Sequence, residues 1–114
     1  MLTVLIDDVR QFTDGRDCIR CLNSAEAVTV LQALHDAGTF IDDLWLDHDL
    51  GPDDDVRPVL ELLLNWHDAG TPLAVGTVHV HTASVEGAHL ITQICRRIGY
   101  DVEREYGLVG RFSW

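Results

Sequence analysis

Lysine is absent from this sequence, and positive charge is scarce. All eight cationic residues are arginines, against 19 Asp and Glu residues, so the formal net charge at pH 7 is −11. Catalysis by a lysine side chain is therefore excluded. The charge also argues against a long nucleic acid as a partner, because phosphate backbones are bound by basic surfaces. A small phosphorylated ligand held by a metal ion and one or two arginines remains compatible with it.

Long apolar runs are lacking as well. No run reaches the ~18 residues that a membrane-spanning helix needs. The N-terminal residues enter a strand pattern directly, without the basic region of a secretory signal. We therefore expect a cytosolic protein that does not enter a membrane. A length of 114 residues and 46% hydrophobic content favour one globular domain over residues 1–114, with no indication of its oligomeric state.

Cysteine is too scarce for a disulfide framework. The three cysteines are Cys18, Cys21 and Cys95, and an odd number without a secretory signal argues against paired bridges. The Cys18-x-x-Cys21 spacing occurs in zinc and redox sites, but no second pair follows it. We expect a short strand with these two side chains on opposite faces.

What is present is an alternation of strand and helix patterns. Strands are expected over residues 2–6, 18–22, 43–47, 73–80 and 101–106. Helices are expected from the Asn23-Ser24-Ala25-Glu26 capping pattern to Gly38, from the acidic loop 53–55 to Gly70, and from Val85 to Ile98 after a Ser84 cap. The tail to Trp114 is too short to assign. This order predicts an α/β fold with a mostly parallel sheet.

Acidic side chains follow two of the predicted strands. Asp7 and Asp8 come after the first strand, and Asp47 and Asp49 come after the third. The carboxyl ends of parallel strands meet at one edge of a sheet, where open α/β sheets bind ligands. Adjacent carboxylates repel unless a cation lies between them, although Asp7 could simply cap a turn. Oxygen ligands suit Mg²⁺, Mn²⁺ or Ca²⁺.

Histidine and arginine lie next to these acids. His48 stands between Asp47 and Asp49, and His81 follows the fourth strand. We expect His81, rather than His79, to reach over the sheet edge and act as an acid or base. Arg10 is the expected phosphate ligand, because its fork of donors matches phosphate oxygens.

These motifs resemble receiver domains. Ile6-Asp7-Asp8, Leu46-Asp47 and Thr82 are similar to the phosphoacceptor receivers of bacterial signalling, which also need a lysine after the fifth strand. A closer resemblance is to cyclic-phosphate processing receiver domains, over residues 2 to about 98. It rests on Asp7-Asp8-x-Arg10, on Leu46-Asp47-His48-Asp49-Leu50-Gly51, and on His81 followed by a hydroxyl residue. The segment from His81 to Ser84 departs from that group's usual His-Ser-x-Asn.

The resemblance implies a receiver-like (flavodoxin-like) three-layer sandwich. Its five parallel strands would have the order 2-1-3-4-5. The residues between the first two predicted strands of this chain have no helical pattern, so we expect the first helix to be reduced or absent. The implied function is phosphodiesterase-type, metal-dependent hydrolysis of a cyclic phosphate or cyclic nucleotide. The expected roles are a Mg²⁺ or Mn²⁺ site at Asp7, Asp8, Asp47 and Asp49, substrate binding by Arg10, Thr82 and Ser84, and catalysis by His81, Asp47 and His48.

Two other functions remain open at this point. One is a degenerate receiver that is phosphorylated on Asp47. The other is a non-catalytic module that binds or sequesters a nucleotide, as in a small phage or mobile-element protein. The sequence identifies neither the substrate nor the metal.

Overall fold

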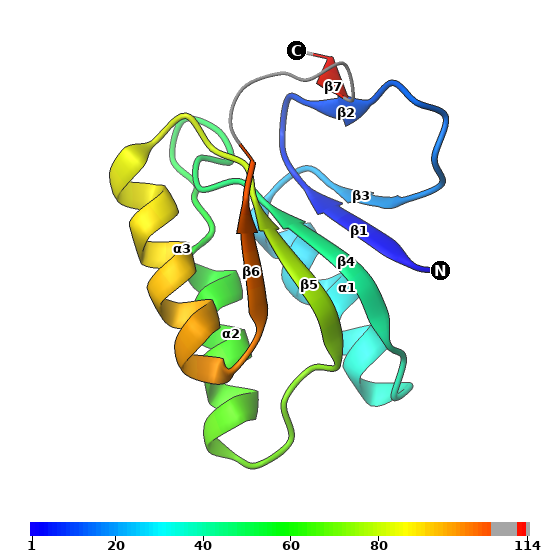
Figure 1. Cartoon of the computed structure of the whole chain (residues 1–114), viewed down its shortest axis with the longest axis vertical. Coiled ribbons are helices and arrows are strands. Elements are labelled where there is room, and N and C mark those ends of the chain that lie inside the picture. Colours follow the sequence, from blue (N-terminus) through cyan, green and yellow to red (C-terminus); the bar gives the residue numbers. More distant parts are fainter. Residues whose placement is uncertain (106–111, 114) are drawn as a thin grey trace.

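A parallel sheet of five strands forms the centre of the computed structural model, which describes residues 1–105 and 112–113. The strands are β1 (Thr3–Ile6), β3 (Ile19–Cys21), β4 (Ile41–Leu46), β5 (Val75–Val80) and β6 (Asp101–Arg104). Their spatial order is β3-β1-β4-β5-β6. Counted without the short β2, this is the predicted order 2-1-3-4-5. The α/β receiver-like fold class is therefore confirmed (Figure 1).

The helices begin and end close to the predicted signals. They are α1 (Ser24–Asp36), α2 (Arg57–Asp68) and α3 (Val85–Ile98). Asn23 caps α1 through Glu26 N–H, and Ser84 caps α3 through Gly87 N–H, as short polar side chains commonly do. Gly99 ends α3 in the left-handed conformation with φ 105°.

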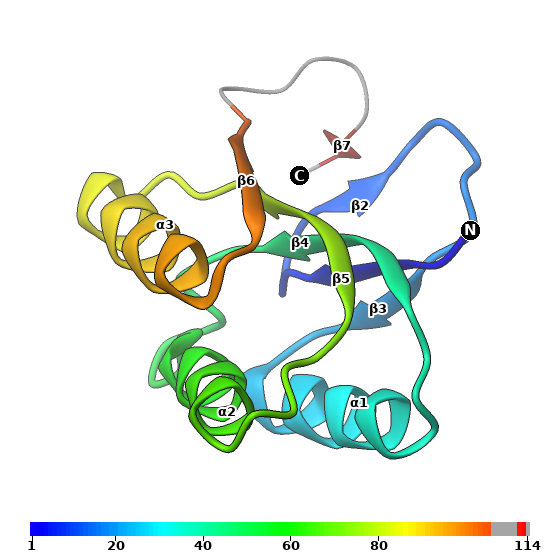
Figure 2. The ribbon, with the colours of Figure 1, turned by 60° about the horizontal axis from the view of Figure 1, so that its bottom comes forward.

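All three helices lie on the same face of the sheet (Figure 2). The predicted three-layer sandwich is wrong in this respect, since no helix in the described part of the chain covers the other face. The reason lies between β1 and β3, where a receiver's first helix would stand. Residues 13–18 there form bends and irregular structure around Gly15, whose φ is 78°, and this segment cannot continue as a helix.

Two short strands were not predicted. β2 (Gln11–Phe12) pairs antiparallel with β7 (Phe112–Ser113), next to the end of the sheet where β1 stops. Each has only two residues, too few to give a period-2 pattern. Tyr106, the last residue of the predicted fifth strand, lies outside the described residues.

The two sheet faces bury different sets of side chains. Among the described residues, twenty buried side chains, including that of Cys21, pack between the sheet and the helices. On the opposite face Leu5 and Trp45 are buried with Phe12 and Cys18 packed against them. Cys18 and Cys21 therefore point to opposite faces, as predicted, and both are free thiols. Within residues 1–105 and 112–113, none of the helices has the length and apolar character needed to cross a bilayer.

Candidate functional site

Three chemically important residues stand at the carboxyl ends of adjacent strands. Each directly follows its strand and donates its backbone N–H to a carbonyl at the end of the neighbouring strand. The bonds are Asp7 to Cys21 at 3.1 Å, Asp47 to Ile6 at 3.1 Å and His81 to Leu46 at 3.0 Å. The sheet register thus brings these residues together at one edge, as the sequence predicted.

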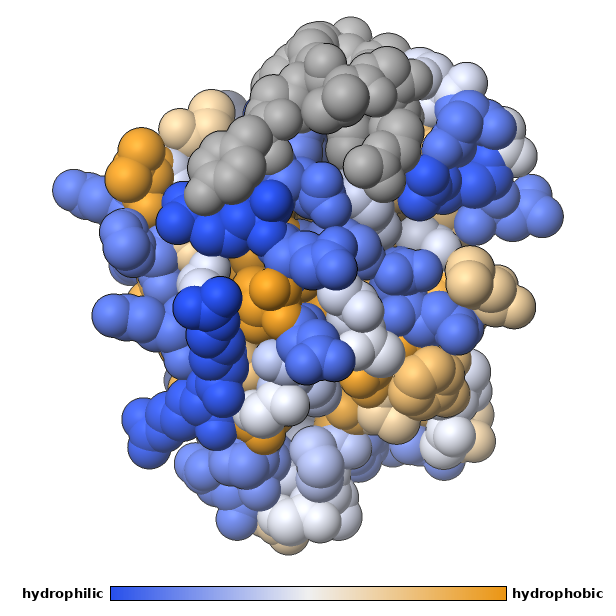
Figure 3. Space-filling model, viewed as in Figure 1, coloured by the Kyte–Doolittle hydropathy of each residue, from blue (hydrophilic) through white to orange (hydrophobic). Residues whose placement is uncertain are grey.

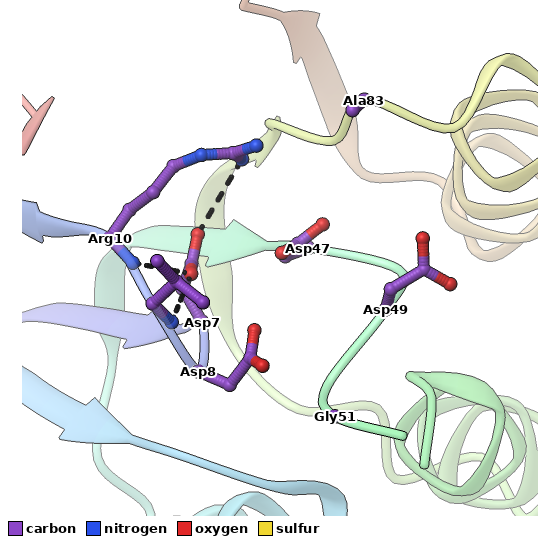
Figure 4. Close-up of a pocket in the computed structure, with 8 residues that line it drawn as sticks. Asp7, Asp8, Arg10, Asp47, Asp49, Gly51 and Ala83 are labelled. Atoms are coloured by element: carbon purple, nitrogen blue, oxygen red, sulfur yellow. Dashed lines mark hydrogen bonds and ion pairs between the residues drawn. The ribbon is translucent and has the colours of Figure 1, made fainter. Parts of the chain in front are cut away.

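Three carboxylates converge at this edge. Oxygens of Asp7, Asp8 and Asp47 lie within 4.8 Å of one another. Asp7 and Asp47 are only 1% and 8% exposed, whereas Asp8 is half-buried. They line a cavity of about 310 Å³, with Arg10 on one side and Ala83 and Gly51 on the rim (Figure 4). Two carboxylates with little access to water are held together with few positive charges nearby.

Asp7 organises the loop that follows β1. One oxygen, Oδ1, accepts the backbone N–H groups of Val9 and Arg10 at 2.9 and 2.8 Å. The other oxygen, Oδ2, lies 3.7 Å from Nη1 of Arg10. The turn-capping role considered for Asp7 is therefore real, and a carboxylate oxygen of Asp7 also belongs to the three-carboxylate cluster. One side chain can fulfil both roles.

Arg10 is buried and is held against His81. Its Nη1 lies 2.6 Å from Nδ1 of His81 and donates to the His81 carbonyl at 3.2 Å. A guanidinium has no acceptor and does not lose its proton in proteins, so Nδ1 must accept. His81 is then a neutral imidazole with its hydrogen on Nε2. It is 5% exposed.

Asp47 has a perturbed proton affinity. Burial, and then the nearby charge of Asp7, raise its pKa to about 6, against the lowering effects of a hydrogen bond from Thr82 and the charge of Arg10. The Thr82 hydroxyl also accepts the Ser84 N–H at 3.2 Å. Thr82 thus orients Asp47, and its predicted contact with substrate stays a prediction.

Three other predicted site residues are placed less centrally. His48 turns toward the start of α3, where its ring lies against Gly87, and its Nδ1 is 2.9 Å from Asp49. Asp49 lines the cavity, but its side chain is 68% exposed and it stands outside the three-carboxylate cluster. The Ser84 hydroxyl is engaged in capping α3. The proposed metal, catalytic and substrate roles of these three residues stay predictions.

One structural contact of the site was not predicted from the sequence. The second helix was expected to begin from the acidic loop 53–55, yet Asp54 of this loop binds α1. Its carboxylate accepts the Ser24 N–H at 2.7 Å and the Ser24 hydroxyl at 2.6 Å. Of the three acids, Asp55 contacts the start of α2, where its side chain accepts the Arg57 N–H at 2.8 Å. The loop that carries Asp49 and Gly51 is thereby tied to the amino end of α1. No local pattern could reveal this contact across 30 residues.

The fold and the acidic edge together define a receiver-like α/β domain. A family model of the cyclic-phosphate processing receiver domain matches residues 2–97. The chain therefore belongs to this family, as the LDHDLG and Asp-Asp-x-Arg motifs suggested. Searches of curated proteins and of solved structures gave no significant match.

Proposed function

We propose that this protein hydrolyses a cyclic phosphate or cyclic nucleotide with the help of a divalent cation. The observation that carries the proposal is the convergence of Asp7, Asp8 and Asp47 beside the buried Arg10, in a cavity of about 310 Å³. That volume is at the small end of the range for small-molecule sites. The family's association with cyclic-phosphate processing supports the same substrate class.

The residues of the cluster fit a divalent cation. Three carboxylates and one guanidinium leave two negative charges in a poorly hydrated space. Their all-oxygen donor set suits Mg²⁺ or Mn²⁺. Asp7, Asp8 and Asp47 would hold the ion. When bound, such an ion supplies Lewis-acid chemistry, in which it polarises a phosphoryl oxygen and makes hydroxide available near neutral pH.

Arg10 would bind the phosphate group. It lines the cavity, while its Nη1 is directed to His81 by two contacts. A guanidinium has five N–H donors in a rigid fork, so this anchoring orients the whole group. A positioned cation of this kind stabilises negative charge that develops on phosphoryl oxygens.

His81 would act mainly by positioning Arg10. Its Nδ1 accepts from the guanidinium, so it cannot take a proton from water while that contact is kept. The proton-transfer role predicted from the sequence stays a prediction. The two roles are separated by His81→Gln, because an amide oxygen can accept from Arg10 but cannot relay a proton at neutral pH.

The test is a turnover screen of cyclic nucleotides and 2′,3′-cyclic phosphates with Mg²⁺ or Mn²⁺. We expect hydrolysis of at least one substrate by the wild type, loss of hydrolysis with EDTA, and loss in Asp47→Asn. Asp53→Asn is the matched control, because Asp53 is an exposed acid outside the cluster. Binding of these compounds without turnover would instead support the sequestering module.

A further inference from the structure

A second group of potential metal ligands lies on the sheet face opposite the helices. His79 Nδ1 and carboxylate oxygens of Glu103 and Glu105 lie within 4.8 Å of one another. Nδ1 is 3.1 Å from Glu105 Oε1 and 3.7 Å from Glu103 Oε2. Hydrophilic side chains gather over β5 and β6 on this face (Figure 3). The group is separate from the aspartate cluster, which shares none of its residues.

The sheet register creates this group. His79 on β5 is directly opposite Glu103 on β6, so the two side chains stand on the same face. Glu105 follows β6 and donates its N–H to the Val80 carbonyl at 2.9 Å, which continues the pairing with β5 and places its side chain on the same face as Glu103. The ligands thus come from paired backbones and not from a flexible loop.

The His79 ring is held in one orientation. Its Nε2 lies 2.7 Å from Asp43 Oδ1, and the ring stacks on Trp45 with centroids 4.1 Å apart and planes 7° apart. Metal-binding histidines usually donate their second ring N–H to a carboxylate in this way, which directs the other nitrogen to the metal. Here the Asp43 contact directs Nδ1 toward the two glutamates.

We propose that His79, Glu103 and Glu105 form a binding site for a transition-metal ion of the Zn²⁺ class. One imidazole nitrogen and two carboxylates match the ligands that Zn²⁺ uses with water completing its shell. The nitrogen donor separates this site from the all-oxygen cluster, which suits Mg²⁺ or Mn²⁺. His79 is 8% exposed and Glu103 is largely exposed, so the site has one buried and one accessible side.

Carboxylates face both nitrogens of the His79 ring. Among the described residues, Asp43 on β4 lies against Nε2, and Glu103 and Glu105 at β6 lie against Nδ1. A divalent cation placed between Nδ1 and the two glutamates would be attracted by their carboxylate charges.

The test is calorimetric titration of the whole chain with Zn²⁺, in excess Mg²⁺ that occupies the aspartate cluster. A Cys18→Ser background removes the partly exposed thiol as a competing ligand. We expect one Zn²⁺ per chain. Glu103→Gln should weaken its affinity by at least about 10–100-fold, the range seen when even a supporting hydrogen bond of a metal site is lost. Asp43→Asn should weaken it within that same range.

Two controls keep the result decisive. Asp101→Asn makes the same charge change on the same strand, opposite Thr77 rather than His79, and should bind Zn²⁺ like the background protein. Asp47→Asn should also keep the Zn²⁺ site, which distinguishes it from the site of the proposed hydrolysis. Glu103 is 65% exposed, so Glu103→Gln should fold normally. Equal Zn²⁺ affinity in Glu103→Gln and the background, or no binding at all, would show that His79 belongs to an ion-pair network only.

Discussion

The guanidinium of Arg10 donates to the imidazole of His81 across 2.6 Å, and both side chains are at least nine-tenths buried. This contact joins the loop after β1 to the end of β5, two strands away in the sheet. It also fixes the tautomer of His81, since the arginine can only donate. A substitution of either residue is therefore expected to disturb the other, because both depend on the same contact.

We expect His81→Ala and Arg10→Ala to lower turnover non-additively. Removal of either partner destroys the same arrangement, so the double variant should be about as slow as the slower single variant. His81→Gln should retain most of the activity because its amide oxygen can accept from Arg10. The measurement is kcat/KM with a substrate identified in the screen. If Gln is as damaging as Ala and the single effects multiply, each in the range of about 10²–10⁴, His81 acts by proton transfer.

A divalent cation should stabilise the folded protein. An ion at 100 times its dissociation constant should add about 2.7 kcal/mol to the free energy of unfolding. Asp47→Asn should abolish this response, whereas Asp53→Asn should keep it. Thermal unfolding with Mg²⁺, Mn²⁺ or EDTA checks the prediction. An unchanged melting temperature in all three conditions would refute a metal site at the sheet edge.

The free energy of unfolding of the metal-free protein should fall as pH rises through the range in which Asp47 loses its proton. Its pKa in the folded protein is raised to about 6, so between pH about 4 and 6 the folded state binds more protons than the unfolded chain. The corresponding loss is about 3 kcal/mol. Asp47→Asn removes the titrating carboxyl group. The free energy of unfolding of this variant, relative to that of the wild type, should therefore increase from pH 4 to pH 8. Urea unfolding at several pH values, with EDTA present, measures the difference. A pH-independent difference would contradict it.

Asp47 should not form a durable acyl phosphate. Receiver domains hold that group with a lysine, and this chain has none. We expect no stable mass increase after treatment with acetyl phosphate and Mg²⁺. Intact-mass spectrometry is the measurement, with Asp47→Asn as the blank. A phosphoryl adduct present on the wild type alone would favour the degenerate-receiver function.

Gly87→Ala should destabilise the protein through His48. A Cβ at position 87 would lie 2.5 Å from both Cβ and Cγ of His48, far inside contact distance. Overpacking of this kind costs about 1–3 kcal/mol. The double variant Gly87→Ala/His48→Gly lacks both the Cβ and the ring at position 48. Relative to His48→Gly alone it should lose less stability than Gly87→Ala loses relative to the wild type, as measured by urea unfolding. An equal loss in both backgrounds would mean that the helix backbone, rather than the His48 side chain, resists the substitution.

Much of the fold follows from local patterns in the sequence. Ser84 and Gly99 bound α3 because capping and left-handed termination depend on neighbouring residues alone. The convergence of Asp7, Asp47 and His81 follows from parallel topology, since each residue comes directly after a strand.

The remaining contacts depend on tertiary register. Nothing in the local sequence says that Glu103 is paired with His79, or that Asp54 reaches Ser24. The loop after β1 was correctly expected to lack a helix, but the absence of helices on the second face is a property of the whole arrangement. Likewise, the contact of Arg10 with His81 joins residues that are 71 positions apart in the sequence.

The contact between His48 and Gly87 has a consequence for how such sequences can diverge. The His48 side chain occupies the space that any other side chain at position 87 would need. The sizes of the residues at positions 48 and 87 are therefore linked. Relatives that carry a larger residue at position 87 should carry a smaller one at position 48, while those with histidine at 48 should keep glycine at 87. The conspicuous LDHDLG motif is therefore constrained partly by a helix that begins 34 residues after its last residue.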